Sequence, residues 1–248
     1  MTTSDNTAGR PVGGEQPPDG PAAPAGRRHE PDLRRMTRIH LRPIASPMPL
    51  GFYAVAIASV IVGCLQLGVF DEDAHRAVAF TILPAFILQL LVGVLAFGAR
   101  DVLAATLMAC FSGTWLATSL VLAFDPPGGA EVLGVLNLAF TVFAGLMASV
   151  AKAKRALWLV LCVAVPRFAV AAVFNLSGIA WVGVVSGALG LVLASVALYA
   201  AFALMLEEMR GEQVLPIGRS GPAHHAVEGD LTVQLRNLER AAGVRRTL

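Results

Sequence analysis

Residues 178–206 read GIAWVGVVSGALGLVLASVALYAAFALML, a stretch of 29 residues without a charged side chain. At a rise of about 1.5 Å per residue, a helix of this length exceeds the roughly 20 residues that cross the hydrocarbon core of a bilayer. Leu, Ala, Val and Gly dominate the stretch, and the alternation typical of a half-buried strand is absent. The stretch therefore predicts a membrane-spanning α-helix, whose backbone polar groups pair within the helix.

Five similar apolar runs precede it along the chain, separated by short polar breaks. Six such runs predict an all-α polytopic membrane protein with six transmembrane helices. We expect residues 46–218 to form this transmembrane domain, between a cytoplasmic N-terminal tail (1–45) and a cytoplasmic C-terminal tail (219–248). The five runs lie at about 50–70, 77–98, 102–124, 129–150 and 156–175.

The composition and the placement of charge support this class. Of 248 residues, 56% are hydrophobic and 15% are charged, and the mean hydropathy is +0.67, which excludes an ordinary soluble enzyme. The formal net charge of +2 averages a nearly uncharged middle with two charge-rich ends, so it does not indicate nucleic-acid binding. Only eight charged residues fall in residues 77–206: Arg100, Asp101, Asp125, Glu131, Lys152, Lys154, Arg155 and Arg167.

Basic residues in the breaks predict the orientation of the chain. Arg100 and the cluster at 152–155 fall in the second and fourth breaks, whereas the odd-numbered breaks carry only one basic residue, Arg76, and several acids. By the positive-inside rule the even breaks are cytoplasmic, and with six spans so are both termini, in a plasma (inner) membrane. No apolar segment of a signal peptide precedes the first span.

The two tails differ in character. Residues 1–33 are rich in Pro, Gly, Ala and Asp and too poor in large apolar side chains to offset the entropy of ordering, which predicts disorder. Near the other end, Leu231, Leu235 and Leu238 recur at helical spacing among charged residues. This pattern predicts a short amphipathic helix, on the membrane surface or against a partner.

Few residues suggest catalytic or metal chemistry. Cys64, Cys110 and Cys162 lie inside predicted spans without CxxC spacing, which favours small core residues over metal ligands. The five histidines fall in the tails or the first break, so they predict no buried metal cluster or proton relay. The sequence carries no phosphate-binding loop, nucleophile elbow or pair of intramembrane acids. We therefore expect neither an enzyme nor a resident metal or cofactor.

Neutral polar residues at membrane depth have two interpretations. Their hydrogen-bonding groups could line a path for a small polar solute, without a fixed charge that would trap it. Alternatively they bond between helices, which is the commoner role of a single Ser or Thr. The set comprises Gln66, Gln89, Thr106, Ser112, Thr114, Thr118, Asn137, Thr141 and Asn175.

The last two spans carry further signals. Gly183, Gly187 and Gly190 form a small-residue face that predicts close packing of the last span against a neighbour. Arg167 follows Pro166 about twelve residues into the fifth span, in its outer half. An intramembrane arginine is a candidate functional residue: it either attracts an anion into an outer vestibule or reaches the outer headgroups.

Two motifs at the ends of the apolar region carry a family resemblance. Ser46-Pro47-Met48-Pro49-Leu50-Gly51-Phe52 resembles the Asn-Pro-Ala-Pro-Leu-Gly-Leu signature of the acetate uptake transporter family, the acetate/succinate permeases. Residues 208–218, EMRGEQVLPIG, resemble the family's Glu-Gln-Phe-Gly-Arg-Thr-Val-Leu-Pro-Ile-Gly ending. Diffuse matches between these motifs include Gln89, Gly93, residues 111–115, Phe140, Thr141, Arg155 and Asn175.

The resemblance implies a six-helix protomer, assembled as a hexamer, in which each protomer encloses a narrow path for acetate and similar carboxylates. The family's central constriction maps to Val55, Phe111 and Ala164, a set that stays apolar but is smaller at two positions. Pro47 and Pro49 leave backbone amides near the start of the first span, where a helix N-terminus favours an anion. The candidate pathway residues are Ser46, Pro47, Pro49, Leu50, Gly51, Val55, Gln89, Phe111, Thr141, Ala164, Arg167 and Asn175.

Three departures from the family pattern change side-chain chemistry. Ser46 replaces the signature Asn and loses its amide donors. The family's acids near the inner ends of the second and sixth spans fall on Ala96 and Leu204, which questions coupling or assembly that depends on carboxylates. The family has an apolar residue at the position of Arg167, so the resemblance does not explain this arginine.

The leading functional hypothesis is a transporter or channel for small monocarboxylates such as acetate, with a short dicarboxylate such as succinate as a further substrate. Burying an unpaired carboxylate is costly, so cotransport with a proton is chemically reasonable, and without a buried acid or histidine that proton travels on the substrate. The expected partners are the carboxylate, the proton, membrane lipids and further copies of the chain. The alternatives are a non-transporting membrane scaffold of the same fold and a path for ammonia.

Overall fold

The computed structural model describes residues 45–210 and 214–216, which lie in one compact unit. The disordered segment expected at 1–33 and the amphipathic helix expected beyond residue 230 lie outside the described residues. The same holds for most of both tail domains.

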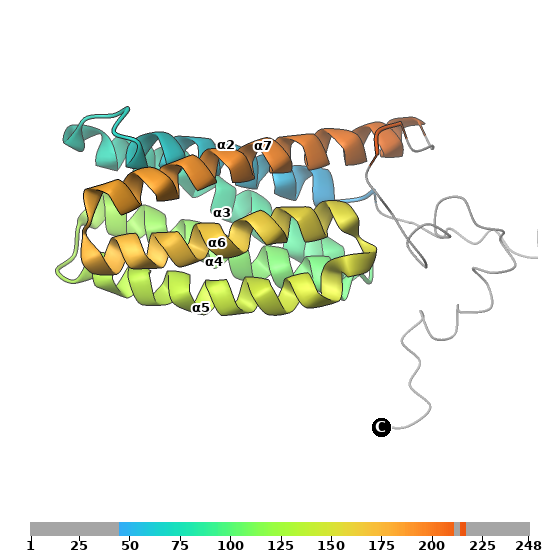
Figure 1. Ribbon diagram of the computed structural model, residues 1–248. Helices are drawn as coiled ribbons and strands as arrows, with labels where there is room; N and C mark the ends of the chain where they lie inside the picture. The colour runs from blue at the N-terminus through green and yellow to red at the C-terminus, as the bar shows by residue number, and fades with distance from the viewer. Residues whose placement is uncertain (1–44, 211–213, 217–248) are drawn as a thin grey trace, which may run out of the picture. The chain divides into compact units, whose positions relative to one another are not determined.

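Within the described residues the chain folds into six long α-helices, all apolar enough to span a membrane, and it contains no strand (Figure 1). The fourth expected span agrees with its helix to the residue, and the second begins two residues earlier than expected. Two short 3₁₀ turns, at Glu72–Ala74 and Ala151–Ala153, join helices. The helices are α2 (Met48–Gln66), α3 (His75–Gly98), α4 (Val102–Phe124), α5 (Gly129–Val150), α6 (Arg155–Ser177) and α7 (Ala180–Arg210).

Successive helices run up and down, so the bundle has two distinct ends. The hairpin end carries the connections 67–74, 125–128 and 178–179. The terminal end carries the start of α2, the connections 99–101 and 151–154, and the end of α7 (Figure 1). Arg100 and the 152–155 cluster therefore lie at the same end of the bundle, the terminal end. The sequence predicted this, because it placed the second and fourth breaks on one side of the membrane.

Local chemistry explains where several helices begin and end. Asp101 caps α4, because its side chain accepts a hydrogen bond from the amide of Ala104 at 3.1 Å. Gly178 follows α6 in the left-handed region, with a φ of 65°, and its amide donates to the carbonyl of Phe174. Pro49 lies in the first turn of α2. Its nitrogen carries no hydrogen, but an N–H at this position would have no carbonyl of the same helix to bond, so no helical hydrogen bond is lost.

The predicted close packing of α7 is confirmed. The helices pack chiefly in three pairs, α3 with α4, α2 with α7 and α5 with α6, whereas the backbones of α4 and α5 come close over only a short stretch. The backbones of α2 and α7 approach at Gly63 and Gly187, where a Cβ added to Gly187 would lie 2.8 Å from the carbonyl oxygen of Gly63. The small residues thus let the two helix backbones approach closely.

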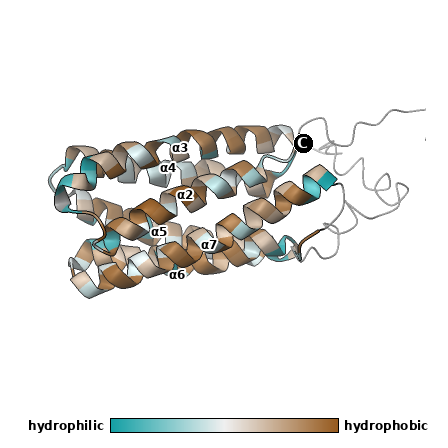
Figure 2. Cartoon of the chain, turned by 90° about the horizontal axis from the view of Figure 1, so that it is seen from above, coloured by the Kyte–Doolittle hydropathy of each residue, from teal (hydrophilic) through white to brown (hydrophobic). Residues whose placement is uncertain are grey.

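The outside of the bundle is apolar along its middle and hydrophilic at its two ends (Figure 2). Large hydrophobic side chains such as Phe80, Ile87 and Val142 are more than half exposed, as expected of a surface that meets lipid or neighbouring subunits. Cys110 and Cys162 are also exposed, so their expected place in the core is wrong. Hydropathy identifies a span but not which helix face points inward.

Candidate functional site

A cavity of about 220 Å³ lies inside the six-helix unit. On α2 its lining extends from Gln66 at the hairpin end to Phe52 near the terminal end, which is about 21 Å of helix. Every one of the six helices contributes to the lining. The cavity is therefore the interior of the bundle and not a groove on its surface.

The half of the cavity nearer the hairpin end, here called the polar half, carries neutral hydrogen-bonding groups and one cation. Asn137 donates from Nδ2 to the carbonyl of Leu133 on its own helix at 2.8 Å. His75 also lines this half, which corrects its expected place in a loop: the 3₁₀ turn ends at Ala74, and α3 begins at His75. Polar lining residues include Ser59, Gln66, Thr118, Asn137, Arg167 and Asn175.

Arg167 lies inside the bundle, not among headgroups. From α6 its guanidinium reaches the seam between α2 and α7, where Nη1 donates to Ser186 Oγ at 2.7 Å and Nη2 donates to Gln66 Oε1 at 3.0 Å. Ser186 is fully buried. The guanidinium thus supplies a fixed positive charge to the wall of the cavity, held by two neutral acceptors.

The other half of the cavity, here called the apolar half, contains the residues expected at the constriction. Val55, Phe111 and Ala164 all line the cavity, and all three are buried. Phe111 is packed against Phe140, Phe143 and Phe168, with ring centroids 5.5–5.8 Å apart. The rings meet in tilted or edge-to-face arrangements, which are favourable for aromatic pairs. The aromatic cluster fixes Phe111 from the side of α5 and α6.

Several candidate pathway residues lie outside the cavity lining. Thr141 donates to the carbonyl of Asn137 within α5 at 2.9 Å. Ser112 likewise bonds back to a carbonyl of its own helix, and so does Thr114, although Thr114 lines the cavity. Such a bond satisfies a hydroxyl without a partner helix. The neutral polar residues therefore serve in three ways: some line the cavity, some bond within their own helix, and Gln66 and Gln89 bond between helices, as the second interpretation expected.

Gln89 lies on the α3–α4 interface. It is fully buried, and its Nε2 donates to Met108 Sδ at 3.7 Å, while Oε1 has no hydrogen-bond partner within the part of the chain that the structure describes. Gly51 of α2 reaches the same place, because an added Cβ would lie 2.9 Å from Met108 Sδ. This glycine of the Pro-Leu-Gly motif lets α2 approach α3 and α4 closely.

The start of α2 lies at the terminal end, beyond the apolar half. Pro47 is the residue before the helix, and it has no side chain that could cap the helix. Ser46 and Pro49 are partly buried, and Leu50 is exposed. These residues lie outside the cavity lining.

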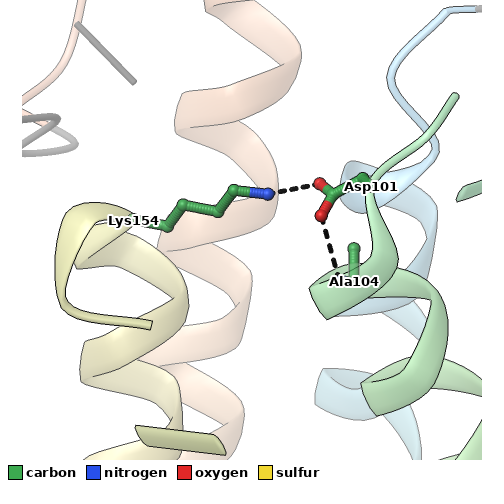
Figure 3. A network of polar contacts seen from close by, with 3 residues as sticks. All are labelled: Asp101, Ala104 and Lys154. Atoms are coloured by element: carbon green, nitrogen blue, oxygen red, sulfur yellow. Dashed lines mark hydrogen bonds and ion pairs between the residues drawn. The ribbon is translucent and has the colours of Figure 1, made fainter. Parts of the chain in front are cut away.

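An ion pair ties two connections together at the terminal end (Figure 3). Lys154 Nζ contacts Asp101 Oδ2, while the other oxygen of Asp101 caps α4. The two side chains are 40% and 28% exposed, so water screens the pair. The pair joins the start of α4 to the α5–α6 connection.

The positions where the family pattern has acids carry no polar group here. Ala96 is fully buried and is packed with Ala104 and Ala105, whereas Leu204 packs against the main hydrophobic core. Among the described residues no group of three or more His, Cys, Asp or Glu side chains could hold a metal ion. The chemistry that the cavity offers is hydrogen bonding and one positive charge.

Sequence reasoning missed Phe143 and Phe168 as neighbours of the constriction. Phe140 and Phe143 are three residues apart and so share a helix face, which is the available signal. In an apolar span, however, an aromatic pair at this spacing is as common on a lipid-facing surface. Only the packing of α4, α5 and α6 shows that the rings meet.

Six membrane-length helices around a partly polar cavity define a polytopic helical membrane protein with an internal cavity. A sequence profile of the GPR1/FUN34/yaaH family matches residues 29–216, and the chain belongs to this family. The succinate-acetate/proton symporter SatP of Escherichia coli K12 is 29% identical in an alignment of 185 residues that covers 71% of this chain and 97% of that protein. Acetate permease A of Emericella nidulans is 27% identical over 115 residues, 46% of this chain and 37% of that protein.

The comparison extends to a solved structure. The structure of the bacterial acetate channel SatP matches with a TM-score of 0.62 at 27% identity, and the match covers 71% of this chain and 99% of that chain. The expected family and the six-helix membrane fold are thus confirmed. These relatives are named as transporters and channels, which confirms that the family's activity is transport and not enzymatic catalysis.

Proposed function

We propose that this protein is a plasma-membrane transporter or channel for small monocarboxylates such as acetate, with a short dicarboxylate such as succinate as a further substrate. The observation that carries the proposal is the internal cavity, polar towards one end and apolar towards the other. Relatives named as a succinate-acetate symporter, an acetate permease and an acetate channel support the substrate class.

The polar half faces the outside in this proposal. Arg100, Lys152, Lys154 and Arg155 gather at the terminal end, and the positive-inside rule assigns that end to the cytoplasm. Both termini are then cytoplasmic. An anion enters at the hairpin end and meets hydrogen-bond donors before it reaches the apolar half.

The apolar half sets the barrier. Beside Val55, Phe111 and Ala164 a carboxylate exchanges water for hydrocarbon surface, which costs several kcal/mol unless its charge is neutralised. Among the described residues the lining of the apolar half holds no Asp, Glu or His that could relay a proton there, since His75 lies at the hairpin end. A coupled proton therefore travels on the substrate, as its acid form.

The small side chains of the constriction bear on the choice of substrate. Val55 and Ala164 leave more space than the larger residues that the family resemblance expects there. This space suits acids with a longer or less polar chain than acetate. The pathway continues past the start of α2, from Ser46 to Gly51, whereas Gln89 and Thr141 support it from outside the cavity.

We also propose that six protomers assemble, each with its own pathway. The outer surface supports assembly, because α5 is the least buried of the six helices and presents a row of exposed apolar side chains. A hexamer would cover part of this surface, and lipid the rest.

The test is uptake of labelled acetate into liposomes that contain the purified protein. We expect uptake above that of empty liposomes, and a large loss in Phe111→Trp, because the bulkier indole fills the constriction. If the protein carries no short acid into the liposomes, the transport proposal fails and the non-transporting scaffold becomes the favoured alternative. Uptake of ammonia in place of acetate would favour the ammonia path.

A further inference from the structure

Arg167 offers more hydrogen-bond donors than the surrounding helices use. A guanidinium has five N–H groups and no acceptor. One donates to Ser186 and one to Gln66, and three have no partner among the described residues. The side chain lines the cavity, so the remaining donors have access to what enters it.

The charge of the guanidinium also lacks a counter-ion within the described part of the chain. Its two partners are neutral, and the cavity lining there holds no Asp or Glu. A positive charge inside a membrane bundle is costly when it is unpaired, and a structural arginine is normally paired with a carboxylate. The missing carboxylate can come from the contents of the cavity.

Two residues of α7 hold the guanidinium in position. Ser186 is fully buried and accepts from Nη1. At Gly190 a Cβ would lie 3.2 Å from Nε of Arg167, so the glycine makes room for the guanidinium. The side chain is thus placed before any ligand arrives, which reduces the entropy lost on binding.

The bond to Arg167 also orients Gln66. Its Oε1 accepts from the guanidinium, so its Nε2 is directed away from the guanidinium and keeps two N–H groups for other acceptors. Gln66 lines the same cavity as Arg167. Because the guanidinium occupies the amide oxygen of Gln66, the amide N–H groups remain as a second set of donors beside those of Arg167.

We propose that Arg167 and Gln66 form a binding site for a carboxylate in its anionic form, in the polar half. A planar guanidinium and an amide suit two carboxylate oxygens, and the guanidinium bonds are strengthened by charge. Ser186 is a positioning residue, because it acts through Arg167. The inference rests on the proposed function, since the ligand is the transported acid.

The first test is the concentration dependence of acetate uptake in proteoliposomes. Arg167→Gln raises the half-saturating acetate concentration about tenfold or more, because it removes the charge-assisted bonds. Arg167→Lys raises it by a smaller factor, because it keeps the charge but loses the fork of donors. The matched control is Arg76→Gln, which removes an exposed charge at the same end of the bundle.

The second test measures binding without transport, through the thermal unfolding of the purified full-length protein in detergent. Acetate raises the Tm of the wild type more than chloride at the same ionic strength, and Arg167→Met abolishes this difference. Between about pH 6 and pH 8 the acid form of acetate falls about 100-fold while the anion fraction hardly changes. Equal Tm shifts at both pH values are therefore expected.

The outcomes separate this inference from the proposed function. If the wild type carries no acetate, the proposed function fails whatever the Arg167 variants do. If the wild type transports but Arg167→Gln is unchanged, or Arg76→Gln has the same effect, the carboxylate site is wrong. Arg167→Met could instead lower the Tm measured without acetate and leave the acetate-induced rise in Tm intact. That result would show that the arginine stabilises the fold and does not bind the carboxylate.

Discussion

The polar and apolar halves of the cavity belong to the same helices but differ in the chemistry they offer. On α6, Arg167 and Ala164 are less than one helical turn apart, yet one presents a cation and the other a methyl group. On α2, Gln66 and Val55 show the same contrast over a longer distance. The step from binding groups to hydrocarbon surface is therefore short and lies near the middle of α6.

This difference separates two tasks that a transport pathway must perform. The polar half can lower the free energy of an anion that has lost part of its water. The apolar half offers it no such compensation, so the highest barrier is expected there. Changes in the polar half should alter the acetate concentration needed for transport, and changes in the apolar half should alter the maximal rate.

The largest expected effect comes from filling the apolar half. Ala164→Phe places a ring beside Val55 and Phe111, and we expect acetate uptake to fall at least about a hundredfold, about 2.7 kcal/mol of added barrier. Val173→Phe is the control, because Val173 lies on the same helix and is 52% exposed. Equal losses in both variants would show that the ring acts by disturbing α6.

The second largest effect is expected on stability, from a substitution at the contact between α2 and α7. Gly187→Val forces a side chain against the carbonyl oxygen of Gly63 and against Leu67, so we expect a loss of about 2 kcal/mol of stability. Thermal unfolding of the purified protein measures the loss. Gly145→Val is its control, since a Cβ at Gly145 meets nothing within 4 Å. A Tm unchanged in Gly187→Val would contradict the close approach of α2 and α7.

A smaller effect is expected at the terminal end, away from both halves. Asp101→Ala removes the ion pair with Lys154 and the cap of α4, which together contribute about 1 kcal/mol. Asp101→Asn keeps a capping side chain and should lose less than half of that. Acetate uptake should be unchanged in both, and a large fall in uptake would place part of the pathway at this ion pair.

The smallest effect concerns the polarity of the constriction. Val55→Thr has nearly the same shape but adds a hydroxyl, so we expect about a threefold higher maximal rate, about 0.65 kcal/mol of barrier. Uptake at saturating acetate measures it. Val92→Thr is the control, because Val92 is fully buried but does not line the cavity. A gain of uptake in the control would refute the role given to Val55.

Hydropathy alone predicted the six spans, because a helix in lipid must be long and apolar whatever it packs against. The same uniform hydropathy hid the inward faces, and for this reason Cys162 was expected in the core and Phe168 was overlooked. Arg167 stood out because charge is rare in a span, but its partners on α2 and α7 lie 101 and 19 residues away in sequence. Such contacts depend on helix packing that no local pattern encodes.

The central claim, binding in the polar half and a barrier in the apolar half, is tested most directly by one uptake experiment. Initial rates of acetate uptake are measured over a wide concentration range for the wild type, Arg167→Gln and Val55→Thr. We predict that Arg167→Gln raises the half-saturating concentration, whereas Val55→Thr raises the maximal rate alone. If both variants change the same parameter, or if the wild type does not exceed empty liposomes, the account is contradicted.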